Sequence, residues 1–158
     1  MPSMHYHQGS HDLCLFYSAA SLLDYIGFKE AGHSVARVGL QYEGAMDTLG
    51  ILRDVVMEHV PKCLQPKHLK KGWDYLSLPE RAFAFVILET KDGGANHVVA
   101  IYKNMIFDSN EHEAILLSKE TLNYCVNPGD GTKFKCINSG FQFAVQGRGK
   151  GLQGTLLN

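Results

Sequence analysis

The sequence predicts an α+β domain in which N-terminal helices pack on an antiparallel β-sheet, giving two layers around one core. The first half of the chain places apolar residues at helical spacing, whereas the second half contains short β-branched and aromatic runs separated by turn sequences. A chain of 158 residues, of which 45% are hydrophobic, is long enough to bury such a core. We therefore expect residues 1–158 to form a single domain.

The first predicted helix carries the most informative residue of the chain. Asp12 suits the N-cap of this helix, and apolar residues at spacings of three and four continue to Tyr25 or Ile26. Gly27 follows, and glycine is the residue that most often ends a helix. Cys14 is thereby placed in the first turn.

Two further helices are predicted from the same kind of spacing. One covers Ala45–Val60 and ends at Pro61, and the other is a short helix at Ser118–Val126. The segment Lys29–Gly44 contains three glycines and is predicted to be a loop with at most a short strand. The segment Lys62–Pro79 is expected to be irregular and solvated.

The second half of the chain predicts the sheet. Its expected strands are short apolar runs bounded by turn residues: Ala82–Leu88, Val98–Tyr102, Met105–Phe107, Lys133–Ile137 and Phe141–Val145. The second and third of these runs are so close that they predict a tight hairpin. The glycine-rich tail 146–158 is expected to be a flexible end, in preference to the remnant of a self-cleavage.

Composition restricts the function classes. The 15 basic and 16 acidic residues give a net charge of -1, which predicts neither nucleic acid nor membrane as a partner. No apolar stretch approaches the roughly 20 residues of a membrane span, and the N-terminus lacks the apolar core of a secretion signal. We expect a cytoplasmic monomer, or one in the host cytoplasm if it is viral or an effector. The four cysteines are widely spaced and are expected to be reduced and free of metal.

Cys14 is the candidate nucleophile. A cysteine in the first turn of a helix gains thiolate character from the unpaired backbone N–H groups and the positive end of the helix dipole. The alternative is a small buried packing residue, which is how Cys63, Cys125 and Cys136 are interpreted.

The residues before Cys14 resemble a known active-site entry. The stretch Gln8-Gly9-Ser10-His11-Asp12-Leu13-Cys14 places a glutamine six residues ahead of the cysteine. It is similar to the papain-like cysteine peptidases, and the resemblance implies that Gln8 and the Cys14 backbone N–H form an oxyanion hole. The residues flanking Cys14 depart from the plant and lysosomal branch, so the resemblance is to divergent viral, bacterial-effector or deubiquitinase-like members. It implies a papain-like fold in which the nucleophile's helix packs on the sheet.

His97 is the candidate acid/base. It opens an apolar strand, and Asp108 and Asn110 follow the next one. A hairpin turn at Tyr102-Lys103 would pair His97 with Asp108, whereas a turn one residue later would pair it with Asn110. The papain-like resemblance implies a base and an orienting partner at these positions, and we favour Asp108 because a carboxylate also stabilises an imidazolium.

Other residues are given lesser roles. Gly93, Gly94 and Asn96 precede His97 and are expected to line the substrate cleft. Trp73 and Tyr75 are candidates to cover a substrate, although a core position is the more common place for a lone tryptophan. The alternating His5, His7 and His11 could bind a metal, but we interpret them as exposed residues of the N-terminus.

The predicted activity is that of a cysteine peptidase without a cofactor, acting on a protein or peptide. Its Cys-His-Asp triad would hydrolyse peptide or isopeptide bonds through a thioester. Two alternatives remain: a transglutaminase-like or amidase-like acyltransferase with the same triad, and an inactive papain-like module that only binds a protein.

Overall fold

The computed structural model describes residues 14–41, 48–91, 97–111, 113–126 and 133–145, and this part of the chain has an α+β fold. The helices are α1 (Cys14–Tyr25), α2 (Lys29–Gln41), α3 (Thr48–His59), the 3-10 helix η1 (Tyr75–Ser77) and α4 (Lys119–Val126). The strands are β1 (Leu64–Leu69), β2 (Ala82–Thr90), β3 (His97–Tyr102), β4 (Met105–Phe107), β5 (Ile115–Leu116) and β6 (Phe134–Val145).

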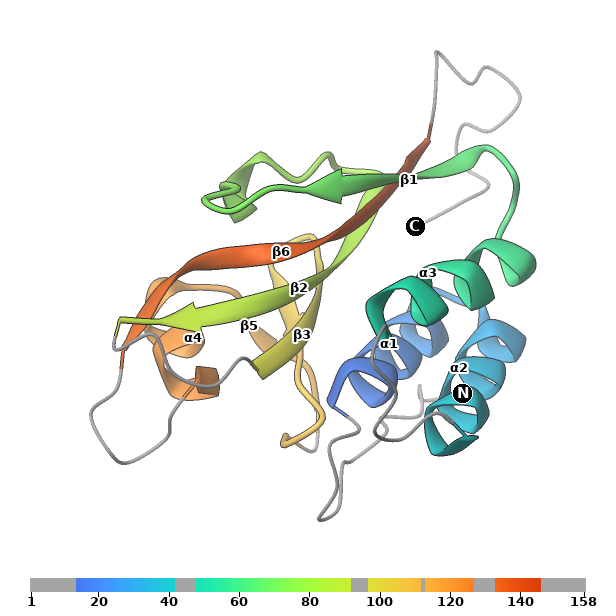
Figure 1. The fold of residues 1–158 in the computed structure, drawn as a ribbon, viewed down its shortest axis with the longest axis horizontal. Coiled ribbons are helices and arrows are strands. Elements are labelled where there is room, and N and C mark those ends of the chain that lie inside the picture. Colours follow the sequence, from blue (N-terminus) through green and yellow to red (C-terminus); the bar gives the residue numbers. More distant parts are fainter. Residues whose placement is uncertain (1–13, 42–47, 92–96, 112, 127–132, 146–158) are drawn as a thin grey trace.

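The strands form one antiparallel sheet in the order β1-β6-β2-β3-β4-β5. Helices α1, α2 and α3 lie on one side of this sheet and α4 lies on the other (Figure 1). Each side has its own apolar core. The predicted α+β class and the packing of the N-terminal helix on an antiparallel sheet are therefore confirmed. The prediction of two layers around one core is wrong, because α4 covers the second face of the sheet and adds a second core.

Strand β2 shows how the two cores share one sheet. Phe83 and Phe85 belong to the core under α1, whereas Ala84 and Val86 belong to the core under α4. Because neighbouring side chains of a strand point to opposite faces, a strand covered on both sides is apolar almost throughout. This explains the unbroken apolar run that marked β2 in the sequence.

The end of α1 is formed as predicted. Gly27 has a φ of 101°, the left-handed conformation that glycine adopts without strain. The N–H of Phe28 donates to the Leu23 carbonyl at 2.8 Å, and the N–H of Gly27 donates to the Asp24 carbonyl at 3.1 Å. These bonds satisfy the last carbonyls of the helix and turn the chain into α2.

The loop predicted at Lys29–Gly44 is wrong, because residues 29–41 form α2. Its glycines serve helix packing. A Cβ atom on Gly39 would lie 2.6 Å from the Phe16 Cβ, and one on Gly32 would lie 3.0 Å from the Ala20 carbonyl oxygen. Glycine at these two positions allows α2 to approach α1 closely, which outweighs its low helix propensity.

Three strand predictions also need correction. The segment predicted to be irregular contains β1 and η1, and the two strands predicted at the C-terminal end are one strand, β6. β6 stays continuous because register shifts near Ile87 and Glu89 of β2 absorb its irregular middle. The short strand β5 had not been predicted at all. None of the described helices is long and apolar enough to cross a membrane.

Candidate functional site

The hairpin formed by β3 and β4 positions the candidate base. Tyr102 pairs with Met105 and Ala100 with Phe107, so the turn residues are Lys103 and Asn104. Lys103 adopts a φ of 55°, the left-handed conformation required by this short turn. Of the two turns considered from the sequence, the structure therefore contains the second.

Asp108 is nevertheless the residue that contacts His97. The Nε2 atom of His97 lies 2.7 Å from Oδ1 of Asp108. Because β4 ends at Phe107, the register that would place Asn110 opposite His97 does not continue. Extending the pairing by one residue places Asp108 opposite Val99, diagonal to His97 and within reach of its side chain.

Local backbone structure holds the Asp108 carboxylate. The N–H of Asn110 donates to Oδ1 of Asp108 at 3.0 Å, and the N–H of Glu111 donates to the Asp108 carbonyl at 3.0 Å. These bonds form the tight turn that aspartate favours after a strand. The Asn110 residue itself is exposed, so its contribution to the pair comes through its backbone.

The pair combines burial with charge. The Asp108 side chain is 2% exposed and that of His97 is 15% exposed. Burial alone would raise the pKa of Asp108, but the hydrogen bond and the positive charge of His97 outweigh it, so the pKa lies below its ordinary value. Asp108 therefore remains ionised at neutral pH and orients the imidazole.

A second thiol lies near this pair, on α4. The side chain of Cys125 is hydrogen-bonded to Asp108 and is buried in the core under α4. Burial raises the pKa of the Cys125 thiol, and the negative charge of Asp108 raises it further. At neutral pH Cys125 is accordingly a protonated thiol that donates a hydrogen bond to the carboxylate.

Helix α1 is attached to the same segment from the other side of the sheet. The fully buried Ser18 donates its hydroxyl hydrogen to the Val98 carbonyl at 3.4 Å and accepts the N–H of Ser109 at 3.1 Å. Val98 adjoins His97, and Ser109 adjoins Asp108. One hydroxyl thus connects α1 to the backbone on which both members of the pair are carried.

The backbone of Cys14 lies near the start of β3. Ser18 contacts Val98, and the ring of Tyr25 packs edge-to-face against that of Tyr102 with centroids 6.4 Å apart, so α1 and β3 run in the same direction. Cys14 precedes Ser18 by one turn, about 6 Å along the helix axis, which corresponds to roughly two strand residues. The first residue of α1 is therefore level with the beginning of β3, although the Cys14 side chain lies outside the described part of the structure.

Because side chains of a strand alternate between the two faces of the sheet, β3 restricts where the His97 imidazole and residue 14 can meet. His97 pairs with Leu88, whose side chain is buried under α4, whereas α1 covers the opposite side of the sheet. Contact between the imidazole and residue 14 is consequently possible only past the end of the sheet, where β3 begins.

The remaining predicted residues are distributed as follows. Gln8, Gly93, Gly94 and Asn96 lie outside the described residues, as do His5, His7 and His11. Trp73 and Tyr75 pack against the core under α4, which favours the core interpretation of both.

Sequence reasoning missed Ser18 and assigned Cys125 only to packing. The helical spacing of four between Cys14 and Ser18 could have indicated that Ser18 faces the same way as the candidate nucleophile. No sequence signal connects Cys125 to Asp108. Among the described residues, no cluster of histidine, cysteine and carboxylate side chains could hold a metal ion.

Comparison with known proteins returned neither a matching family model, nor a similar curated protein, nor a similar solved structure.

Proposed function

We propose that this chain is a cysteine hydrolase of the papain-like type, which cleaves peptide or isopeptide bonds with Cys14, His97 and Asp108. The observation that carries the proposal is the 2.7 Å contact between His97 and Asp108 at the end of the sheet where α1 begins. A buried carboxylate that orients an imidazole can activate a nucleophile that reaches the imidazole past this end of the sheet.

The hydrogen bond to Asp108 assigns a separate role to each ring nitrogen of His97. Nε2 donates to Asp108, so Nδ1 is the atom that exchanges a proton with the nucleophile. The imidazole takes the thiol proton of Cys14, and the sulfur attacks the substrate carbonyl carbon. Collapse of the tetrahedral intermediate breaks the C–N bond, and the imidazolium returns its proton to the leaving amine.

The second half of the reaction releases the acyl group. The thioester carbonyl is attacked by a water molecule whose proton passes to His97, and the sulfur leaves as thiolate. Gln8 and the backbone N–H of Cys14 are proposed to hold the oxyanion in both halves.

The electrostatics of α1 support Cys14 as the nucleophile. None of the residues described in the first turn of the helix is acidic, so none of them neutralises its positive end. Cys125, the thiol that contacts Asp108 directly, is buried and has a raised pKa. Burial also raises the pKa of Cys136, whose thiol donates to Glu89.

The test is to trap the nucleophile with two substrate-like electrophiles in parallel. A peptide acyloxymethyl ketone and ubiquitin bearing a C-terminal vinyl ester are incubated with the chain, and adducts are located by mass spectrometry. We expect modification of Cys14 that is lost in His97→Ala. Equal modification of all four cysteines would contradict the proposal, and the preferred electrophile would distinguish peptide from isopeptide substrates.

A further inference from the structure

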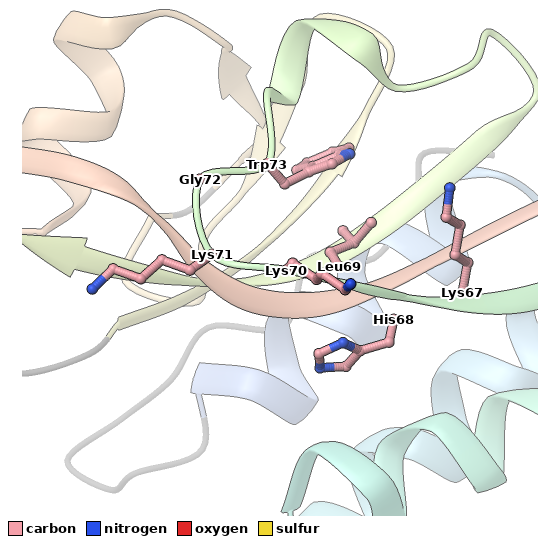
Figure 2. A pocket seen from close by; sticks show the side chains of 7 residues that line it. All are labelled: Lys67, His68, Leu69, Lys70, Lys71, Gly72 and Trp73. Atoms are coloured by element: carbon pink, nitrogen blue, oxygen red, sulfur yellow. The ribbon is translucent and has the colours of Figure 1, made fainter.

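A pocket of about 460 Å³ opens at the edge of the sheet farthest from β5. It is lined by the consecutive residues of β1 and the turn after it (Figure 2): Lys67, His68, Leu69, Lys70, Lys71, Gly72 and Trp73. Three of these seven residues are lysines, and none is acidic. The pocket therefore has the character of a site for a negatively charged ligand.

Neighbouring carboxylates neutralise only part of this charge. Glu89 forms ion pairs with Lys71 at 3.3 Å and with Lys135 at 3.4 Å. Asp74 instead accepts the N–H of Leu76 as the cap of η1. Lys67 and Lys70 are exposed and form no ion pair with any side chain that the structure describes, so their ammonium groups face solvent at the pocket.

The pocket also has apolar walls. Lys67, Leu69 and Trp73 project to the same side of the strand, with Leu69 between the other two (Figure 2). Leu69 is 2% exposed, and Trp73 is half-buried against the core under α4. Leu76, which is 77% exposed, follows in η1. A ligand that fits would place an anionic group at the lysines and apolar groups beside the indole.

Recognition through strand addition is disfavoured at this edge. Pro66 in the middle of β1 has no N–H to donate, and the N–H of Leu64 already donates to the Pro61 carbonyl. A peptide lying along β1 would find few backbone partners. Side chains, and not backbone pairing, must therefore provide the recognition.

The pocket is level with the His97–Asp108 pair across the sheet. The N–H of Gly72 donates to the Ile137 carbonyl, Ile137 pairs with Leu88, and Leu88 pairs with His97. Gly72 and His97 are therefore separated by three strand spacings, a distance of about 15 Å. An extended peptide of four or five residues covers this distance. Lys71 and Lys135 lie along this end of the sheet.

We propose that the pocket binds an acidic segment of a polypeptide, with its carboxylates at Lys67 and Lys70 and a neighbouring apolar side chain against Trp73. A nucleic acid fits less well, because the chain has a net charge of -1 and the pocket contains one tryptophan, no phenylalanine or tyrosine, and no arginine. If the chain hydrolyses peptides as proposed above, the pocket selects substrates with acidic residues several positions from the cleaved bond. That extension alone rests on the proposed function.

The experiment measures binding without turnover. Fluorescence anisotropy is recorded for the full chain carrying Cys14→Ala with a fluorescein-labelled peptide of four Glu-Leu repeats and with a matched peptide of four Gln-Leu repeats. We expect the Glu-Leu peptide to bind at least about tenfold more tightly, and this preference to weaken as salt is added. The combined Lys67→Ala and Lys70→Ala substitutions should remove most of the preference.

The matched control combines Lys62→Ala and Lys119→Ala, which remove two exposed lysines outside the pocket and should leave the preference unchanged. Equal affinity for the two peptides, no binding of either, or an equal loss in the control variant would overturn the proposal. So would tighter binding of an oligothymidylate of the same charge. Because this variant cannot form a thioester, these results are independent of whether Cys14 is a nucleophile.

Discussion

The two sides of the sheet each contribute one polar side chain to the segment that carries Asp108. From the α1 side, Ser18 accepts the N–H of Ser109 and so fixes the backbone. From the α4 side, Cys125 donates to the Asp108 carboxylate and so affects its charge. Ser18 therefore sets the position of this segment, whereas Cys125 sets the electrostatic environment of Asp108. Losing Ser18 should disturb the alignment of α1 with the His97–Asp108 pair, whereas losing Cys125 should raise the pKa of Asp108 and leave that alignment intact.

Removing the nucleophile should have the largest effect. Cys14→Ala is expected to lower the rate of p-nitrophenyl acetate hydrolysis at least about 10³-fold, to the rate in buffer, because none of the thiols that the structure describes lies at the start of a helix. Cys63→Ala is the matched control and should retain the rate. If the rate fell equally in both variants, or fell in neither, Cys14 would not be the nucleophile.

Asp108→Asn should have the next largest effect. An amide can accept from His97 but cannot stabilise its positive charge, so kcat is expected to fall about 10²-fold or more. Asn110→Ala keeps the backbone N–H that holds Asp108 and should remain within about threefold of the wild type. A larger loss in Asn110→Ala than in Asp108→Asn would make Asn110 the orienting residue.

Ser18→Ala tests the connection from the α1 side. It leaves the Ser109 N–H without its partner in the core and should lower the free energy of unfolding by ~1–3 kcal/mol. It should also lower kcat about tenfold, because α1 is no longer fixed against β3. Ser21→Ala, which removes a bond to the Tyr17 carbonyl of the same helix, is the matched control for stability and should retain kcat. Equal kcat losses would assign Ser18 a purely structural role.

Acid unfolding tests the charge of Asp108. Its pKa is lowered in the folded state, so the stabilisation is present above the ordinary carboxyl pKa of about 4 and is lost as the pH falls through the folded value. Urea titrations between about pH 2 and 7 should show this loss in the wild type. The pH dependence should be weaker in Asp108→Asn, and identical slopes would argue against an ionised Asp108.

Cys125→Ala should have the smallest effect. Without the thiol donor the folded-state pKa of Asp108 rises toward its ordinary value, so the loss of stability on acidification is smaller and is complete at a higher pH. Cys125→Ser retains a donor and should restore the wild-type acid profile, even though both variants lose some apolar packing. Activity at neutral pH should remain within about threefold in both. An unchanged acid profile in Cys125→Ala would show that the thiol contributes nothing to the carboxylate.

The parts of the fold predicted correctly are those in which local pattern and tertiary packing agree. The glycine that ends α1 and the hairpin containing His97 are local features that the sequence specifies by itself. Helix α2 was missed because Gly32 and Gly39 are selected for contact with α1, and such contacts cannot be read from one segment. Strand β1 was missed because it lies at an edge, where Pro66 and Lys67 are tolerated.

The same distinction applies to the candidate site. The proximity of His97 to a polar residue after β4 followed from counting along the hairpin, but the choice of Asp108 depended on where β4 ends. Ser18 and Cys125 act across the sheet, and neither contact follows from sequence spacing. Contacts of this kind can be identified only from the three-dimensional structure, in which helices on both faces of the sheet meet the same segment.

The most direct test is the pH dependence of Cys14 alkylation by iodoacetamide, measured by mass spectrometry in the wild type and in His97→Ala. If the imidazole takes the thiol proton, Cys14 reacts rapidly well below pH 8 in the wild type. In His97→Ala, the reaction should require a pH near the ordinary cysteine pKa of about 8.5. The same profile in both proteins would show that Cys14 and His97 do not form a pair.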